Sequence, residues 1–90
     1  MDLDRTLNSV GKTIFIKYYY DFKLKTREEC ICNFVEPYTD HAKSTRTGHA
    51  QRIFRENKQI DALNIIIQSN RLDEETISRA KEILFAENSK

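Results

Sequence analysis

Residues 58–69 read KQIDALNIIIQS, and six of these twelve side chains are aliphatic. Successive residues of an α-helix are rotated by about 100°, so Ile60, Leu63, Ile65 and Ile66 would lie nearly all around the helix axis. A helix with so little polar surface needs cover on most sides. The stretch therefore predicts a central, enclosed helix over residues 58–69, or one that a second copy of the chain covers.

The rest of the chain also favours helices. Only two glycines and one proline occur in 90 residues, whereas an all-β domain of this size needs turn residues every 8 to 12 positions. We expect an all-α fold of about five short helices in one compact bundle, forming a single domain over residues 1–90, with a helix–loop–helix unit in the middle.

The first helix is expected over residues 4–22. Apolar side chains recur there at helical spacing, at Leu7, Val10, Ile14 and Tyr18. The β-branched and aromatic residues of the segment 14–22 suit a strand equally well, so a short hairpin is the alternative.

The second helix has a clear start. Thr26, followed three residues later by Glu29, is a capping box, in which each side chain satisfies a backbone amide of the first turn. Pro37 is expected to stop the helix, because the residue before a proline is disfavoured in helical conformation. The predicted buried face consists of Cys30, Ile31, Phe34 and Val35.

A polar loop is expected over residues 36–44, followed by a third helix capped by Thr45 or Thr47. Its apolar stripe is Ala50, Ile53 and Phe54. The last helix is expected to begin after the cap residue Asp73, and residues 87–90 to fray. Its predicted inner face consists of Ile77, Ala80, Ile83 and Leu84.

Charge is unevenly distributed, although the net charge is only +1. Residues 37–60 contain five lysines and arginines and two acidic residues, Asp40 and Glu56. The side of the third helix opposite its apolar stripe is thus rich in hydrogen-bond donors, which is typical of nucleic-acid-binding helices. The candidate nucleic-acid-binding residues are Lys43, Ser44, Thr45, Arg46, Thr47, His49, Gln51, Arg52, Arg55 and Lys58.

These residues suggest a division of roles. Residues 43–47, at the predicted helix start, would hold phosphates, whereas Arg52 and Arg55 would read or brace a groove. We expect a DNA-binding regulatory or accessory protein whose partner is duplex DNA and which acts as a homodimer. The predicted connection is longer than that of a standard helix-turn-helix.

A protein–protein interaction module of adaptor or inhibitor type is the alternative. In that case the basic face only solubilises the protein, and a partly exposed ring from the run Tyr18, Tyr19 and Tyr20 contacts the partner.

Other chemistry is not indicated. Cys30 and Cys32 would point to opposite sides of a helix, about 200° apart, and their spacing with His41 and His49 matches no zinc motif. No catalytic motif occurs, so we expect no enzyme, no catalytic residue, no metal or other cofactor and no small-molecule substrate. The sequence holds neither a membrane span nor a signal peptide, and a cytoplasmic location is expected.

Overall fold

The structure, a computed structural model, describes residues 2–89. In that part of the chain there are seven α-helices and no strand, so the all-α prediction is confirmed and the hairpin alternative is wrong. The helices are α1 Leu3–Val10, α2 Lys12–Lys17, α3 Tyr19–Leu24, α4 Arg27–Asn33, α5 Asp40–Arg55, α6 Gln59–Ile67 and α7 Glu74–Asn88.

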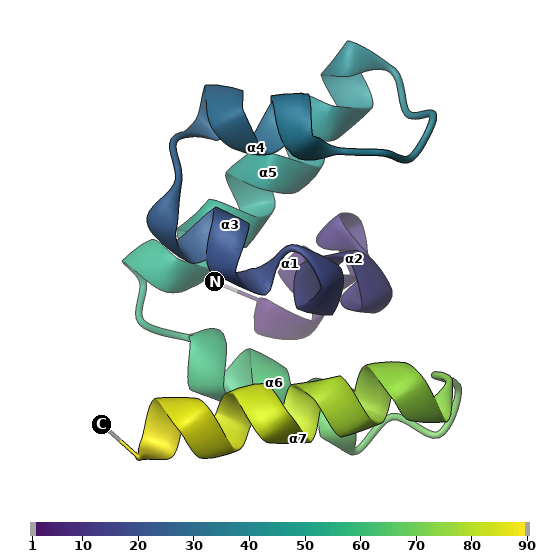
Figure 1. The fold of residues 1–90 in the computed structure, drawn as a ribbon, viewed down its shortest axis with the longest axis vertical. Coiled ribbons are helices and arrows are strands. Elements are labelled where there is room, and N and C mark those ends of the chain that lie inside the picture. Colours follow the sequence, from purple (N-terminus) through teal and green to yellow (C-terminus); the bar gives the residue numbers. More distant parts are fainter. Residues whose placement is uncertain (1, 90) are drawn as a thin grey trace.

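Two pairs of helices lie at opposite ends of the molecule, and the N-terminal helices α1 to α3 lie between them (Figure 1). At one end α6 packs against α7, and at the other α4 crosses the first half of α5. The first three helices lie between these two ends. Helix α1 packs along α5, helix α2 contacts α7, and helix α3 contacts both α4 and α5. The Cα radius of gyration is 12.3 Å.

The first predicted helix is in fact three helices. Gly11 adopts φ +93°, which glycine tolerates and other residues rarely do, and its N–H closes α1 by donating to Leu7. A second break falls at Tyr18. These breaks let the consecutive residues Phe15 and Ile16, and then Tyr18 and Tyr19, all become buried. A straight helix on the surface of a core buries only one face, which explains why the prediction of a single helix is wrong.

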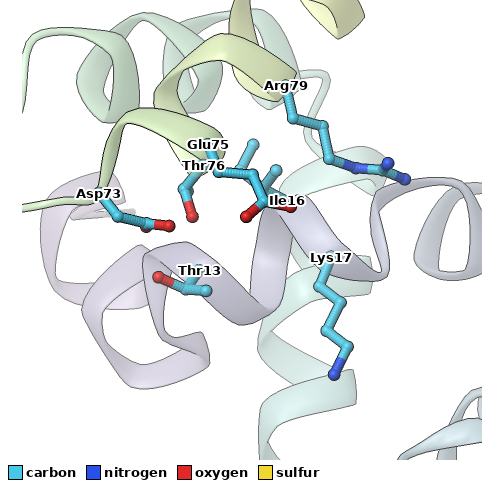
Figure 2. A pocket seen from close by; sticks show the side chains of 7 residues that line it. All are labelled: Thr13, Ile16, Lys17, Asp73, Glu75, Thr76 and Arg79. Atoms are coloured by element: carbon cyan, nitrogen blue, oxygen red, sulfur yellow. The ribbon is translucent and has the colours of Figure 1, made fainter.

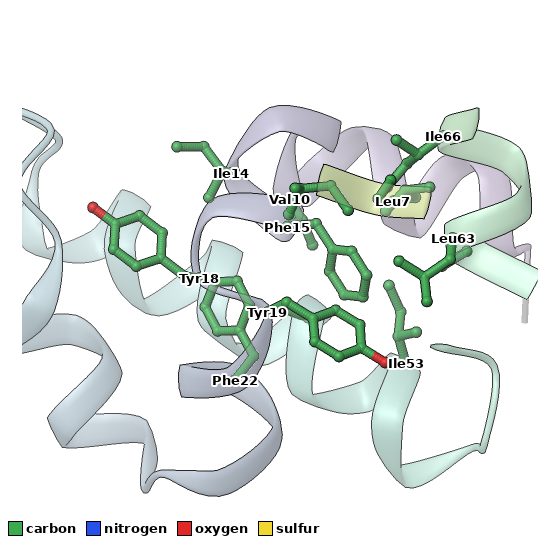
Figure 3. Packing of buried hydrophobic residues seen from close by; sticks show 14 of the residues in the cluster. Leu7, Val10, Ile14, Phe15, Tyr18, Tyr19, Phe22, Ile53, Leu63 and Ile66 are labelled. Atoms are coloured by element: carbon green, nitrogen blue, oxygen red, sulfur yellow. The ribbon is translucent and has the colours of Figure 1, made fainter. Parts of the chain in front are cut away.

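The core gathers side chains from most of the helices (Figure 3). The fully buried residues include Leu7, Phe15, Tyr19, Ile53 and Ile66. The rings of Phe15 and Tyr19 meet edge to face, with centroids 5.5 Å apart. Of the three tyrosines in the run, only Tyr20 is exposed, at 39%, which confirms the expectation of one partly exposed ring.

The aliphatic stretch over residues 58–69 forms α6 at one end of the molecule, against α7, so the prediction of a central helix is wrong, whereas cover by a second copy stays a prediction. Ala62, Leu63 and Ile66 are completely buried, and Ile65 and Ile67 pack against the core while keeping some exposure. The neighbouring α7 extends to Asn88, so the prediction that Glu87 lies in a frayed end is wrong: its carboxylate accepts hydrogen bonds from Lys23 and from the Tyr19 hydroxyl. Lys90, predicted to fray with it, lies outside the described residues.

The predicted inner face of α7 is confirmed at its centre. Ala80 and Ile83 are buried, whereas Ile77 and Leu84 are partly buried. Asp73 takes the predicted N-cap position, although its side chain accepts no capping hydrogen bond.

The capping box of α4 is confirmed, because Thr26 and Glu29 exchange both hydrogen bonds. The helix nevertheless ends at Asn33, well before Pro37. Phe34 still turns into the core, but Val35 is 77% exposed, so its predicted burial is wrong. Cys30 is buried and Cys32 exposed, as the helical spacing predicts.

The predicted loop over residues 36–44 and the predicted caps of the third helix are also wrong. The connection is shorter, 34–39, and α5 begins at Asp40 with Thr39 as its N-cap, the Thr39 hydroxyl accepting from the amide of Ala42. The first turns of α5 are polar because they extend beyond the core, so they lack the apolar periodicity that marks a helix in sequence. Thr39 followed by Asp40 is the sequence signal that could have predicted this helix start.

Candidate nucleic-acid interface

One side of α5 is exposed and rich in hydrogen-bond donors. His41, Thr45, Arg52 and Arg55 are exposed there, and His49 is partly buried at the margin. At about 100° per residue these five positions fall within an arc of about 120°. No acidic residue occurs between Asp40 and Glu56. We call the surface formed by these five residues the exposed α5 face; it offers guanidinium, imidazole and hydroxyl donors without a carboxylate among them.

Glu56, the C-cap residue that follows α5, has a carboxylate beside this face. Nε of Arg52 donates to Oε2 of Glu56 over 2.8 Å, and both side chains are largely exposed. The terminal nitrogens of Arg52 have no hydrogen-bond or ion-pair partner within residues 2–89. The side chains of Arg55 and Lys58 make no hydrogen bond or ion pair with any described residue, so both cations are available to a ligand.

Arg46, a predicted phosphate ligand, serves the fold instead. Its Nη1 donates a 2.6 Å hydrogen bond to the carbonyl of Val10, at the end of α1. Its guanidinium also lies over the ring of Tyr38, 4.2 Å from the centroid. Both contacts tie α5 to other segments, and we therefore place Arg46 outside the interface.

Three other predicted residues also face the interior or neighbouring segments rather than solvent. Thr47 is completely buried, and its hydroxyl has no hydrogen-bond partner among the described residues. The side-chain amide of Gln51 donates to the carbonyl of Lys25 over 3.0 Å. Ser44 accepts hydrogen bonds from Arg27. The sequence analysis assigned Ser44 and Thr47 to a free helix start and Gln51 to the solvated side of the helix. All three lie inside α5, where they face its neighbours.

Lys43 also lies inside the helix and is partly buried. At about 200° from His41 it stands on the opposite side of α5 from the exposed α5 face. Of the residues predicted to hold phosphates, only Thr45 lies on that face.

The connection between α4 and α5 is anchored at its centre. The hydroxyl of Tyr18 donates to Oε1 of Glu36 over 2.7 Å and accepts from the amide of Val35 over 3.1 Å. Lys17 forms an ion pair with Glu36 at 2.6 Å. Burial opposes ionisation of Glu36, but the hydrogen bonds from Lys17 and Tyr18 outweigh it and lower its pKa to about 2. These contacts fix the connection and hence the position of α4 on α5.

A cationic residue that the sequence analysis missed lies beside the exposed α5 face. Arg27, the first residue of α4, donates from Nη2 to the hydroxyl and the carbonyl oxygens of Ser44, at 2.8 and 3.1 Å. It approaches α5 at Gly48, which lies between Ser44 and Arg52 along the helix. The only hint in the sequence was an isolated glycine inside a helical pattern.

A separate pocket of about 370 Å³ opens between α2 and the start of α7 (Figure 2). Its lining combines carboxylates, cations and hydroxyls, and Lys17 is already paired with Glu36. This mixture indicates no particular class of ligand. The residues that line it are Thr13, Ile16, Lys17, Asp73, Glu75, Thr76 and Arg79.

Within residues 2–89, no three histidine, cysteine, aspartate or glutamate side chains gather closely enough to bind a metal ion. None of the helices described has the length and apolar character needed to cross a membrane. Comparison with known families, with curated proteins and with solved structures finds no match to this chain.

Proposed function

We propose that the chain is a regulatory or accessory protein of the cytoplasm that binds duplex DNA through the exposed α5 face. The observation that carries this proposal is a row of donors along one side of a helix, from His41 to Arg55, with no carboxylate among them. Arginine and histidine donors match the acceptors on phosphates and on base edges in the major groove, which accommodates one α-helix.

The packing of α4 across α5 supports the same proposal. A helix that supports a second, exposed helix is the arrangement that helix-turn-helix domains use. The connection here, over residues 34–39, is longer than usual, but the contact of Glu36 with Tyr18 and that of Arg46 with Tyr38 hold it in place. A fixed support matters because flexibility at the interface would have to be lost on binding.

Duplex DNA is favoured over single-stranded nucleic acid by the position of the aromatic rings. Proteins that bind single strands stack bases on exposed aromatic side chains. The only aromatic residue of α5 other than histidine is Phe54, and its ring packs 5.0 Å from that of Tyr19 in the core. The exposed α5 face thus offers hydrogen bonds and charge but no hydrophobic ring for stacking.

A homodimer is part of the proposal, because one helix in a groove contacts too few base pairs for a selective site. The α6–α7 end of the molecule is the favoured dimer surface, because it exposes apolar side chains. Phe85 is 76% exposed there and borders a groove with Ile67 and Leu84.

The test is a titration of the protein into labelled random duplex DNA and into labelled single-stranded RNA, each at two salt concentrations. Fluorescence anisotropy measures the binding. Affinity for the duplex should fall steeply with salt, because bound phosphates release counterions. Replacing both Arg52 and Arg55 by alanine should abolish most of this binding. The matched control, Arg71→Ala with Arg79→Ala, removes the same charge from exposed positions outside α5 and outside the groove at Phe85, and should bind like the wild type.

Two results would overturn the proposal. If the wild type binds neither nucleic acid with a salt-sensitive affinity, the protein–protein module takes its place, with exposed apolar residues such as Phe85 and Val35 as the first candidates for contact. If only the single-stranded RNA is bound, the assignment to duplex DNA is wrong.

A further inference from the structure

Gly48 has no backbone reason to be glycine. It lies in the middle of α5 with an ordinary helical φ, and glycine is among the residues least favourable to a helix. What distinguishes the position is its neighbour. A Cβ at Gly48 would lie 3.6 Å from Cζ of Arg27, an ordinary contact, but 3.3 Å from its Nη2, which is closer than most real Cβ contacts. The missing side chain therefore leaves room for the Arg27 guanidinium against α5.

The Arg27 guanidinium is held there with donors to spare. A guanidinium has five N–H donors, and here Nη2 alone is used, for the two hydrogen bonds to Ser44. Nε and Nη1 make no hydrogen bond or ion pair with any described residue. The side chain is exposed, so these three donors are open to a ligand.

We infer that Arg27 binds a DNA phosphate at the edge of the exposed α5 face. The inference rests on the proposed function and adds to it a contact from α4. Phosphates flank the groove that a recognition helix enters, and Arg27 flanks the helix at Gly48, one turn from both Ser44 and Arg52. A guanidinium already fixed by Ser44 loses less rotational freedom when it binds a phosphate in its fork.

Two variants test the inference from opposite directions. Arg27→Gln removes the cation. Gly48→Ala keeps every charge but adds a methyl group 3.3 Å from Nη2, so that the guanidinium must shift, and it also improves the helix propensity of α5. Arg71→Gln, a change of the same kind at an exposed position outside the α4–α5 unit, is the control. Each protein is titrated with several duplex sequences over a range of salt concentrations.

Arg27→Gln should make the negative slope of log affinity against log salt shallower by about 0.9, the value for one phosphate contact. The same relation gives a loss of about eightfold at 0.1 M salt, equal for all sequences because phosphates carry no base information. Gly48→Ala should also weaken binding, with no decrease in melting temperature. Arg71→Gln should leave both slope and affinity unchanged.

The inference is overturned if Arg27→Gln retains the wild-type slope, or if its loss is confined to particular sequences. If Gly48→Ala binds with wild-type affinity, the position of the Arg27 guanidinium against Gly48 does not matter for binding, and the inference is overturned as well. In all these cases salt-sensitive binding by the wild type leaves the proposed function intact. Failure of the wild type to bind duplex DNA overturns both.

Discussion

Nη1 of Arg46 lies 2.6 Å from the carbonyl oxygen of Val10, 36 residues earlier in the chain. This carbonyl ends α1, where no further helical amide is available to it. The hydrogen bond therefore completes α1 and at the same time fixes α5 against it. An arginine that the charge pattern assigns to a ligand is in this structure a link between two helices.

Arg46→Ala should destabilise the fold by about 1–3 kcal/mol, because it leaves the Val10 carbonyl unpaired and removes the contact with Tyr38. Arg55→Ala is the matched control, with the same residue type on the same helix but exposed, and should change stability by no more than about 0.5 kcal/mol. Urea unfolding measures both. Equal stabilities of the two variants would show that the Arg46 contacts do not stabilise the fold.

Ile66→Ala should be among the most damaging substitutions in the core, at about 2–5 kcal/mol, because Ile66 is completely buried and its loss leaves a cavity. Leu24→Ala, at a position that is 73% exposed, should have little effect. Urea unfolding gives the free energies of unfolding of both variants for this comparison. A small loss in Ile66→Ala would contradict the burial of α6.

Glu56→Gln should raise the affinity for duplex DNA. The substitution releases Nε of Arg52 and removes a carboxylate that would lie close to phosphates. We expect an increase of about two- to fivefold at low salt, in line with the small energies of exposed ion pairs. Glu82→Gln, which makes the same charge change on α7, should leave affinity nearly unchanged. Weaker binding by Glu56→Gln would instead mean that Glu56 positions Arg52.

The stability that Glu36 provides should depend on pH. Its folded-state pKa is about 2, below the usual value of 4.5, so its contribution is complete above about pH 4.5 and is lost as the pH falls toward 2. Glu36→Gln should be less stable than the wild type at neutral pH, and the difference should shrink over this interval. Urea midpoints from pH 7 to pH 2 measure it, with Glu82→Gln as control. A difference that is independent of pH would contradict the assigned pKa.

The proposed dimer predicts a species of twice 10.6 kDa in sedimentation at micromolar concentration. Phe85→Ser should convert it to the monomer, because Phe85 supplies the largest exposed apolar side chain beside α6. Its helical content should be unchanged by circular dichroism. A wild-type species of 10.6 kDa at all concentrations would show that the seven helices need no second copy.

Several elements were predictable because they depend on neighbours in sequence. The capping box of Thr26 and Glu29 needs only two residues three apart, and the burial of Leu63 and Ile66 follows from local spacing. The scarcity of glycine and proline excluded an all-β fold on composition alone. The exposure of Arg52 and Arg55 likewise follows from the apolar stripe on the opposite side of their helix.

Tertiary structure alone decided which polar residues are available to a ligand. Arg46 turns toward Val10, Gln51 toward Lys25, and Arg27 toward Ser44 and Gly48, all through contacts between residues 17 or more positions apart. Periodicity reports only which side of its own helix a residue occupies. It contains no information about which carbonyl or side chain another helix brings to that side. The sequence therefore determined the all-helical fold class and the charge of α5, and the packing of α1, α3 and α4 against α5 selected the residues that remain exposed on it.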